Sequence, residues 1–161
     1  MIGNDIVDLH LAKKQSNWKR KGYVEKVFTV SERRFIKNAK NQEHTVWELW
    51  SRKEAAYKII IQKGGIPGYY PLKIECLDCG LGYGKVQFEK QLFYTRTVFS
   101  DDFIYSEAIV TPHDFDIIEN IPSVELITKQ NGIPFIVLHN SVFFASKTHH
   151  GEFEKAVFLN N

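Results

Sequence analysis

The sequence predicts an α+β protein in which an antiparallel sheet packs around a long buried helix. Helical patterns fill the first part of the chain and strand patterns fill the rest, a segregation that is typical of this class. Residues 43–62 are apolar on two opposite faces, which indicates a helix buried between other elements. A chain of 161 residues with 43% hydrophobic content has the size of one domain. We therefore expect a single domain over 1–161, with an extra strand-rich excursion at about 73–112.

The N-terminus predicts one strand and then a basic segment. IGNDIVDL, residues 2–9, reads as a short buried strand that leads into a helix or loop up to about residue 21. Asp8 stands where it can cap that helix. The position of Asp5, among apolar neighbours, needs another explanation.

Two further helices have recognisable ends. In FTVSERRFIKNA either Thr29 or Ser31 can cap the helix start, and Glu32 lies three residues after Thr29 as in a capping box. The helix over 43–62 is followed by GGIPG, which cannot continue a helix.

The segments after residue 64 predict strands, separated by turn signals such as GLGYG, SDD and QNGIP. GLGYG is not a phosphate-binding loop, because no helix pattern follows it. The predicted strands are YYPLKIEC (69–76), KVQFEKQLFYTRTVF (85–99), FIYSEAIVT (103–111), VELITKQ (124–130), IPFIVL (133–138), VFFASKT (142–148) and FEKAVFL (153–159).

Charge is unevenly distributed although the net charge is only +2. Residues 1–63 hold 14 Lys and Arg against 7 Asp and Glu, whereas residues 64–161 hold 7 against 12. A basic run is often only a solvated surface, but it also attracts nucleic acid, phosphate cofactors or acidic proteins. Only Trp18 and Tyr23 interleave with the basic run, so we do not expect nucleic-acid binding.

The composition also bears on location and on metals. No segment approaches the roughly 20 apolar residues of a membrane span, and the N-terminus lacks a signal-peptide pattern. We therefore expect no membrane association and a cytoplasmic location. Cys76 and Cys79 form a single CxxC, which is a weak zinc signal without a second pair, although the fold could bring His149 and His150 to it. Reduced cysteines in a turn between strands are the expectation.

The helix over 43–62 carries a carboxylate and an ammonium one turn apart. Glu54 and Lys58 share one stripe of the helix with Trp47 and Trp50. Such a pair on a solvated face only stabilises its own helix. The alternative is a catalytic carboxylate beside a cation in a partly desolvated cleft.

A metal at Glu54 needs a second carboxylate from a neighbouring element. Mg²⁺ is usually held by one or two carboxylates together with substrate phosphates. Asp5 is the best candidate, because its flanking residues bury the strand and Gly3 permits close backbone approach. A turn or cap role for Asp5 remains the alternative.

Two motifs resemble the signatures of the 4′-phosphopantetheinyl transferase superfamily. IGNDIVDL resembles its G-x-D strand, and WSRKEAAYK resembles its helical [FW]-[ST]-x-K-E-x-x-x-K. The tail QNGIPFIVLHNSVFFASKTHHGEFEKAVFL is similar to the N-G-x-P motif, then S-x-S-H, then a closing strand. The length resembles the short holo-acyl-carrier-protein synthase type, so a 4′-phosphopantetheinyl transferase-like fold is implied.

The resemblance implies an enzyme that transfers 4′-phosphopantetheine from coenzyme A to a serine of an apo acyl or peptidyl carrier protein, releasing 3′,5′-ADP. It implies Mg²⁺ held by Asp5 and Glu54. Glu54 and Lys58 would be catalytic, Glu54 as the base that takes the serine proton directly or through water. Lys53, Lys58 and His149 would bind coenzyme A.

The resemblance also implies partners. Carrier proteins of this kind are acidic, and the basic segment offers them Lys13, Lys14, Lys19, Arg20 and Lys21. Members of the short group place the active site between subunits, commonly in a trimer, so a homo-oligomer is expected.

The sequence departs from the family pattern in two places. SKTHH stands where S-x-S-H is usual, so Thr148 replaces a serine and either His149 or His150 can be the motif histidine. Val7 stands where long-type members have a second acid, which leaves two carboxylates for the metal.

Two other functions stay open at this point. One is a non-enzymatic module that binds an acidic protein partner through its basic N-terminal half. The other is a different Mg²⁺-dependent phosphoryl-transfer enzyme, which would neither bind nor consume coenzyme A.

Overall fold

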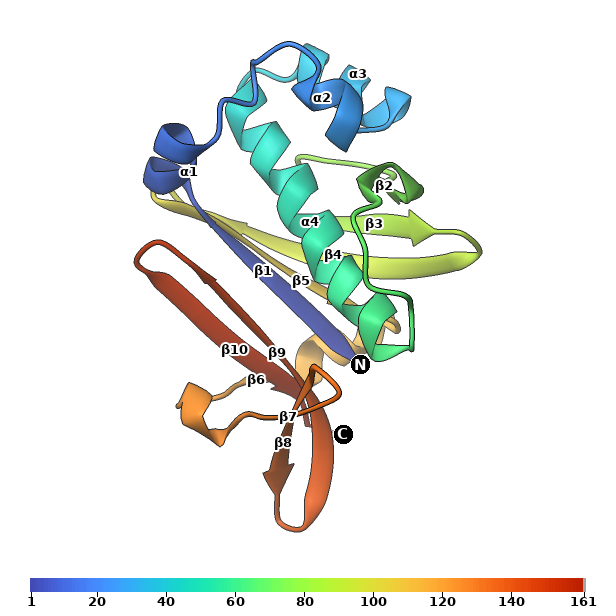
Figure 1. The fold of residues 1–161 in the computed structure, drawn as a ribbon, viewed down its shortest axis with the longest axis vertical. Coiled ribbons are helices and arrows are strands. Elements are labelled where there is room, and N and C mark those ends of the chain that lie inside the picture. Colours follow the sequence, from blue (N-terminus) through green and yellow to red (C-terminus); the bar gives the residue numbers. More distant parts are fainter. Residues whose placement is uncertain (161) are drawn as a thin grey trace.

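The computed structural model describes residues 1–160 and arranges them as two five-stranded antiparallel sheets with helices on one side of the first sheet (Figure 1). The helices are α1 (Leu9–Gln15), α2 (Tyr23–Val27), α3 (Val30–Asn38) and α4 (Gln42–Gln62). The strands are β1 (Ile2–Asp8), β2 (Ile74–Cys76), β3 (Tyr83–Phe88), β4 (Gln91–Phe99), β5 (Phe103–Ile109), β6 (Ile118–Asn120), β7 (Thr128–Gln130), β8 (Ile133–Leu138), β9 (Ser141–His150) and β10 (Phe153–Leu159). Short 3₁₀ helices are η1 (Pro71–Lys73), η2 (Pro112–Ile117) and η3 (Val124–Leu126).

The long helix expected over 43–62 is confirmed as α4. Its N-cap is Asn41, whose side chain accepts a hydrogen bond from the backbone N–H of His44. It ends before Gly64, which has a φ of 88° in the left-handed region that favours glycine. Apolar side chains around most of its circumference are buried: Val46, Leu49, Ala55, Ala56, Ile59 and Ile60. The helix is therefore enclosed, as its sequence predicts.

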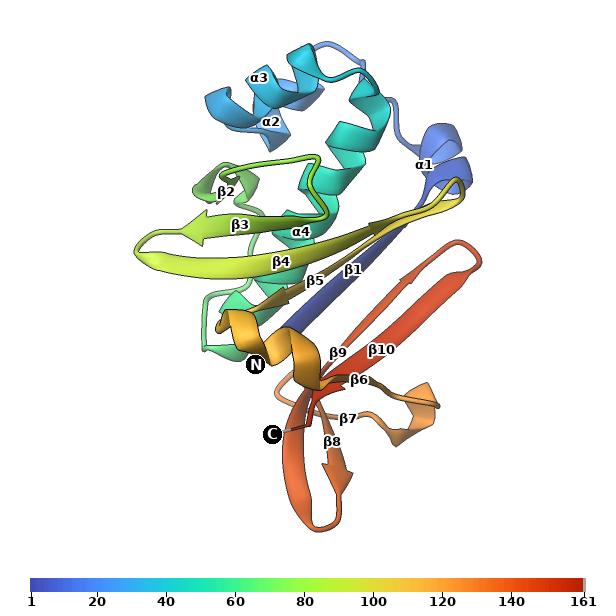
Figure 2. The ribbon, with the colours of Figure 1, turned by 180° about the vertical axis from the view of Figure 1, so that it is seen from behind.

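The first sheet has the order β1-β5-β4-β3-β2, and α4 crosses one of its faces, as Figure 2 shows from behind. The stretch at about 73–112 supplies β2 to β5, which pair in one sheet with β1. Gly3 lets β1 approach α4, because a Cβ at this position would lie 1.9 Å from the backbone oxygen of Ala55. The close approach expected of Gly3 is confirmed.

The helix caps are also as expected. Thr29 accepts a hydrogen bond from the backbone N–H of Glu32, and the Glu32 carboxylate accepts one from the backbone of Thr29, which completes the capping box of α3. Asp8 caps α1 by accepting from the backbone N–H of Leu11 at 2.9 Å. The basic segment, up to about residue 21, contains α1 and the turn that leads to α2.

Some predicted strands differ from the structure. The run over 85–99 is a hairpin, because the chain reverses at Glu89, which has a φ of 53°. The first half of the strand expected over 124–130 is the 3₁₀ helix η3, and only Ile74–Cys76 of the segment over 69–76 is a strand. In the latter, Pro71 begins a 3₁₀ helix, a position where its missing N–H has no cost.

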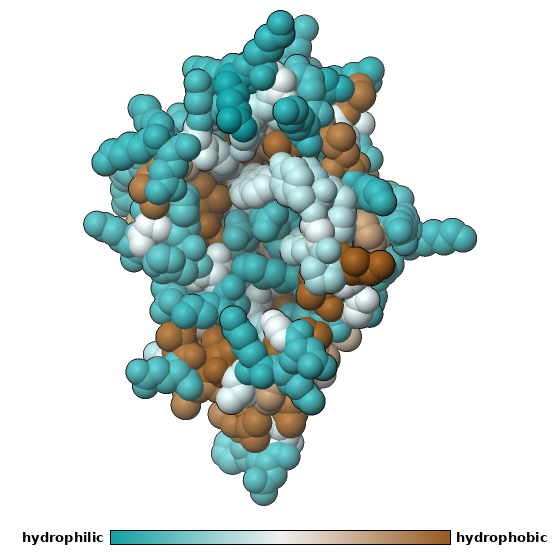
Figure 3. All heavy atoms as spheres, in the orientation of Figure 1, coloured by the Kyte–Doolittle hydropathy of each residue, from teal (hydrophilic) through white to brown (hydrophobic). Residues whose placement is uncertain are grey.

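The second sheet has the order β6-β10-β9-β8-β7, and its β8–β9 hairpin projects from the lower end of the molecule in Figure 1. Apolar side chains gather on this lower part of the surface (Figure 3). The exposed apolar residues of this region are Leu126, Val137, Val142 and Phe144. Within residues 1–160, no helix combines the length and the apolarity that crossing a membrane requires.

Candidate active site

The structure brings Asp5 and Glu54 to one cavity. Asp5 lies in the middle of β1 and Glu54 lies in the middle of α4, and these two elements pack against each other. Both side chains line a cavity of about 240 Å³, together with Trp47 and Trp50. The tryptophans therefore form part of the wall around the two carboxylates, and the expected pairing of Asp5 with Glu54 in space is found.

Burial makes the ionised forms of both carboxyl groups costly. The side chain of Asp5 is only 14% exposed. Burial raises the pKa of Asp5 to about 7, the Lys58 ammonium opposes this rise, and the Glu54 carboxylate adds to it. Burial likewise raises the pKa of Glu54 above its ordinary value, against the effects of Lys58 and Lys53. Two carboxylates in such a site favour a bound cation, which would compensate both charges.

The donor set of this cavity suits a hard cation with few protein ligands. Within residues 1–160, no group of three or more His, Cys, Asp and Glu side chains is arranged to hold a metal. Two carboxylate oxygens, with water and substrate phosphates, are the ligands that Mg²⁺ commonly takes. The residues present therefore fit Mg²⁺ in the cavity of Asp5 and Glu54.

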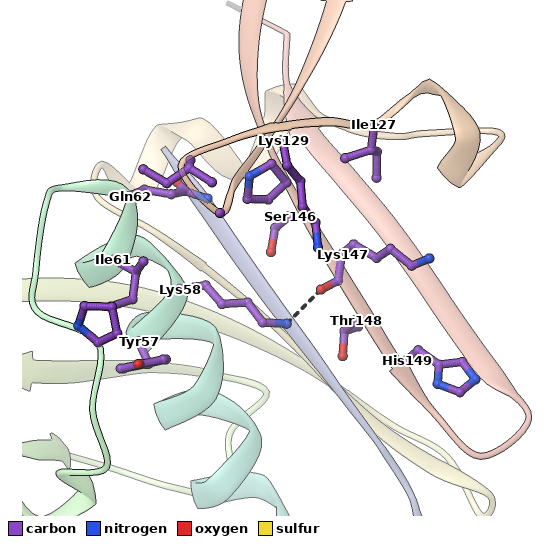
Figure 4. Close-up of a pocket in the computed structure, with 14 residues that line it drawn as sticks. Tyr57, Lys58, Ile61, Gln62, Ile127, Lys129, Ser146, Lys147, Thr148 and His149 are labelled. Atoms are coloured by element: carbon purple, nitrogen blue, oxygen red, sulfur yellow. Dashed lines mark hydrogen bonds between the residues drawn. The ribbon is translucent and has the colours of Figure 1, made fainter.

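Lys58 lies beside these carboxylates and links a strand of the first sheet to a strand of the second. Its Nζ donates hydrogen bonds to the backbone carbonyls of Asn4 on β1 and Lys147 on β9, the second at 2.9 Å (Figure 4). It also lies 4.0 Å from Asp5 Oδ1. Burial lowers the pKa of Lys58, whereas Asp5 and Glu54 oppose this shift. Two backbone carbonyls thus fix the ammonium in place, and its positive charge lies close to the carboxylate of Asp5.

β1 and β9 lie side by side in the same direction and are joined through side chains. The backbone N–H groups of Asn4, Ile6 and Asp8 donate to Ser146 Oγ, Thr148 Oγ1 and His150 Nδ1, at 2.9, 3.1 and 2.8 Å. We call these three β9 side chains and their β1 partners the β1–β9 seam. The seam fastens the strand of Asp5 to the C-terminal strands, and it was not among the contacts expected from the sequence. Its signal is hydrogen-bonding side chains at alternate positions, 146, 148 and 150, which lie on one side of the strand.

The two histidines of β9 have different environments. His150 is committed to the β1–β9 seam, where its Nδ1 accepts from the backbone N–H of Asp8. His149 is exposed and lines both the cavity of Asp5 and Glu54, to which His150 also contributes, and a larger neighbouring cavity. Both belong to β9, and the turn expected for His150 begins only after it. Of the two, His149 is the more exposed and is the one that lines both cavities.

The larger cavity measures about 460 Å³ and lies between α4 and the second sheet (Figure 4). Helix α4 contributes Tyr57, Lys58 and Ile61 to its wall, and the N-G-x-P segment contributes Gly132–Pro134. Lys129, Lys147 and His149 also line it. An elongated anionic ligand placed here would meet the ammonium groups of Lys58, Lys129 and Lys147 and the imidazole of His149 near its charged groups, and apolar side chains elsewhere.

Lys53 lies away from both of these cavities. Its ammonium is buried, with Nζ 2.6 Å from Glu32 Oε2 and 2.9 Å from the backbone oxygen of Val27. Glu32 also accepts from the backbone N–H of Cys76, so the pair ties α3, α4 and β2 together. The Lys53 ammonium is committed to these two buried partners, where burial requires a paired charge, so its position does not favour the expected contact with coenzyme A.

The basic segment borders the smaller cavity. Ala12 and Ser16, in and just after α1, line the cavity of Asp5 and Glu54. Lys13 and Lys14 lie between them in the sequence and are exposed. Exposed too are Lys19, Arg20 and Lys21. The positively charged surface therefore lies next to the cavity of Asp5 and Glu54.

The CxxC cysteines are part of the packing of α4. Cys76 is buried, and its Sγ lies 3.5 Å from the backbone oxygen of Leu49. Burial raises the pKa of the Cys76 thiol well above its ordinary value. Cys79 is partly buried, and both cysteines are unpaired. A buried neutral thiol is neither a good nucleophile nor a good metal ligand.

Comparison with known structures identifies the fold. A holo-[acyl-carrier-protein] synthase from Helicobacter pylori, solved in complex with coenzyme A, aligns with a TM-score of 0.55 and 19% identity, covering 69% of this chain and 100% of that chain. A synthase from Bacillus anthracis, in complex with CoA (3′,5′-ADP), aligns at 0.53 and 22%, covering 66% and 91%. One from Thermotoga maritima aligns at 0.53 and 12%, covering 99% and 83%. A search among curated protein sequences finds no match.

Comparison with family profiles identifies the family. Residues 1–104 match the profile described as the 4′-phosphopantetheinyl transferase superfamily. The matched part contains Asp5, Glu54 and Lys58, and the C-terminal motifs lie beyond it. The chain therefore belongs to the 4′-phosphopantetheinyl transferase superfamily of enzymes and has the holo-acyl-carrier-protein synthase fold.

Proposed function

We propose that the protein transfers 4′-phosphopantetheine from coenzyme A to a serine hydroxyl of an apo acyl or peptidyl carrier protein, with release of 3′,5′-ADP. One observation carries the proposal. Asp5, Glu54 and Lys58, from two elements that are distant in sequence, meet at one cleft in which burial raises the pKa of both carboxyl groups. Membership of the superfamily supports the same reaction.

Asp5 and Glu54 would hold Mg²⁺ in this cleft. When bound, the metal supplies positive charge at the pyrophosphate of coenzyme A and orients it for in-line displacement. Glu54 is also suited to accept the proton of the carrier serine, directly or through water, because its raised pKa makes it a stronger base than an exposed carboxylate. The serine oxygen then bonds to the phosphorus of the phosphopantetheine arm as the bond to the ADP phosphate breaks.

Lys58 has a place on the side of the leaving phosphate. It lines the larger cavity, whereas Asp5 and Glu54 line the smaller one, so it stands at the junction of the two. Two of its hydrogen bonds go to backbone carbonyls, which leaves one donor for a phosphate oxygen. A fixed ammonium at this point stabilises the charge that develops on the leaving group.

Coenzyme A would occupy the larger cavity. Its phosphates would meet His149 and Lys58, and its apolar parts would meet Tyr57, Ile61 and the Gly132–Pro134 segment. This placement brings the pyrophosphate to the shared wall at His149, next to the carboxylates.

An acidic carrier protein would dock on the basic segment. The exposed Lys13 and Lys14 of α1 stand beside the cavity opening, so a helix with acidic residues would be steered there. A cytoplasmic location fits these substrates. We further propose a homo-oligomer, in which the exposed apolar side chains of the second sheet, such as Val142 and Phe144, are covered. Light scattering after size-exclusion chromatography measures its subunit number.

The deciding experiment is intact mass spectrometry of an apo acyl carrier protein after incubation with the protein, coenzyme A and Mg²⁺, with an EDTA control. The proposal expects a metal-dependent gain of one phosphopantetheine group on the carrier. No gain on either acyl or peptidyl carriers, together with no binding of coenzyme A, would overturn it. Binding of carriers without any transfer would then favour a non-enzymatic module.

A further inference from the structure

The carboxylate of Asp5 is held by a residue from the opposite end of the chain. Asp5 Oδ1 lies 3.2 Å from the hydroxyl of Thr148 on β9. The backbone oxygen of Asp5 accepts from Ser51 Oγ of α4 at 3.3 Å. Helix α4 therefore holds the main chain of Asp5, and the β1–β9 seam holds its side chain.

The direction of this hydrogen bond follows from the neighbouring one. The backbone N–H of Ile6 lies 3.1 Å from Thr148 Oγ1, and an N–H can only donate. The Thr148 oxygen must therefore accept from Ile6, which leaves its own proton for Asp5 Oδ1. Thr148 is only 6% exposed, and its β-branched side chain has few rotamers, so the donor is aimed at the carboxylate.

We propose that Thr148 is a positioning residue: its hydroxyl fixes the orientation in which the Asp5 carboxylate, with Glu54, binds a divalent cation. This inference rests on the proposed function, because it assumes that the two carboxylates are the metal ligands. A hydrogen bond that orients a ligating carboxylate raises the affinity for the metal, and its removal commonly costs roughly 10–100-fold. This bond uses one acceptor site of Oδ1, and the carboxylate has further lone pairs with which to bind the cation.

The same seam contains a matched control. Ser146, two residues earlier on β9, accepts from the backbone N–H of Asn4 at 2.9 Å and donates to Asn4 Oδ1 at 2.8 Å. Ser146 thus makes the same pair of hydrogen bonds to β1 as Thr148, but its acceptor is an amide oxygen and not a proposed ligand. Loss of either hydroxyl weakens the seam, whereas only loss of the Thr148 hydroxyl releases Asp5.

The test measures cation binding rather than turnover. The affinity for Mn²⁺, a stand-in for Mg²⁺, is obtained from the electron paramagnetic resonance signal of free Mn²⁺ and from the shift of Tm that Mn²⁺ causes in each variant. We expect Thr148→Val and Thr148→Ala to weaken Mn²⁺ binding roughly tenfold. Thr148→Ser keeps the hydroxyl, so its affinity for Mn²⁺ should lie within about twofold of the wild-type value. Ser146→Ala should also keep its affinity for Mn²⁺ within about twofold, although the Tm of this variant should fall.

The outcomes separate this inference from the proposed function. Wild-type Mn²⁺ affinity in Thr148→Val and Thr148→Ala overturns the inference alone. So does an equal loss in Ser146→Ala, which would show a general effect of the seam. If both Thr148 variants fail to fold while Ser146→Ala folds, Thr148 serves the stability of the seam, and the inference is likewise wrong. Absence of Mn²⁺ binding to the wild type would overturn the proposed metal site and the inference together.

Discussion

Lys58 Nζ lies 4.0 Å from Asp5 Oδ1 while it donates hydrogen bonds to the backbone carbonyls of Asn4 and Lys147. The ammonium therefore belongs both to the cleft and to the junction of the two sheets. Gln62, one turn later on α4, links the same two strands nearer the end of the helix. Its Nε2 donates hydrogen bonds to the backbone oxygens of Ile2 on β1 and Ala145 on β9. Only the first of these two braces faces the carboxylates.

This relationship predicts two effects of Lys58→Ala. Turnover should fall by about 10²–10³, more than the affinity for coenzyme A, because the ammonium acts on charge that develops in the transition state. The free energy of unfolding should fall as well, since two carbonyls lose a donor. Gln62→Ala, which removes the equivalent brace, should lose comparable stability with a smaller loss of turnover. Equal losses of turnover in both variants would mean that Lys58 acts only as a brace.

Glu54→Gln should abolish transfer and leave the fold intact. The substitution is nearly isosteric, but it removes a metal ligand and a base, and loss of a general base alone costs about 10²–10⁴. Circular dichroism and Tm establish the fold, and carrier mass measures transfer. Glu43→Gln, in the first turn of the same helix and away from both cavities, is the control and should transfer normally. Unchanged turnover in Glu54→Gln would remove it from the metal and base roles.

Asp5 should make the metal-free protein less stable as the pH rises. Its pKa is about 7 in the folded protein against an ordinary value of 3.8, so the folded state keeps a proton that the unfolded chain has lost. This contribution to stability is complete below pH 3.8 and is lost as the pH rises through 7. It amounts to about 4 kcal/mol at most.

Asp5→Asn removes that dependence and the metal ligand together. The variant should therefore be more stable than the metal-free wild type at pH 8, and this difference in the free energy of unfolding should be smaller at pH 5. The variant should also be inactive. Urea unfolding at both pH values measures the difference, and excess Mg²⁺ should narrow it by stabilising only the wild type. Asp8→Asn serves as the contrast, because hydrogen bonds lower the pKa of Asp8 and give a dependence of the opposite sign. The prediction would be contradicted if the free energy of unfolding changed with pH by the same amount in the wild type and in Asp5→Asn.

The buried ion pair of Lys53 and Glu32 predicts a loss of stability rather than of binding. Lys53→Met leaves the Glu32 carboxylate uncompensated in the interior, which typically costs about 3–5 kcal/mol. The double variant Glu32→Gln with Lys53→Met should recover part of this loss. Chemical unfolding measures all three proteins, and calorimetry should show that any folded variant binds coenzyme A normally. A selective loss of coenzyme A affinity would restore the phosphate-binding role to Lys53.

Substitution of His149 and of His150 should have different effects on ligand binding and on stability. His149→Ala should weaken coenzyme A binding roughly tenfold, or about 1.4 kcal/mol, with little change of Tm, because its side chain faces the cavities and not the core. His150→Ala should lower Tm, because the backbone N–H of Asp8 loses its acceptor. Isothermal titration calorimetry and thermal unfolding check both. The reverse pattern would assign the ligand contact to His150.

The sequence by itself determined the α+β class, the helix caps, the span of α4 and the pairing of Asp5 with Glu54. These depend on periodicity, on local capping chemistry and on two motifs within the part of the chain that matches the family. Helix wheels also placed Lys53 on a different side from Glu54 and Lys58. They could not show what lay there, because Glu32, its partner, is 21 residues away in the chain.

Only the tertiary structure decided how the two ends of the chain cooperate. The hydrogen bond from Thr148 to Asp5 spans 143 positions, and that from Asp8 to His150 spans 142. Neither has a local signature, because alternating polar residues in a strand indicate a face and not the group that the face meets. The difference between His149 and His150 has the same cause: successive strand residues point to opposite sides, and the packing of β9 along β1 decides which of the two histidines bonds to the backbone of Asp8.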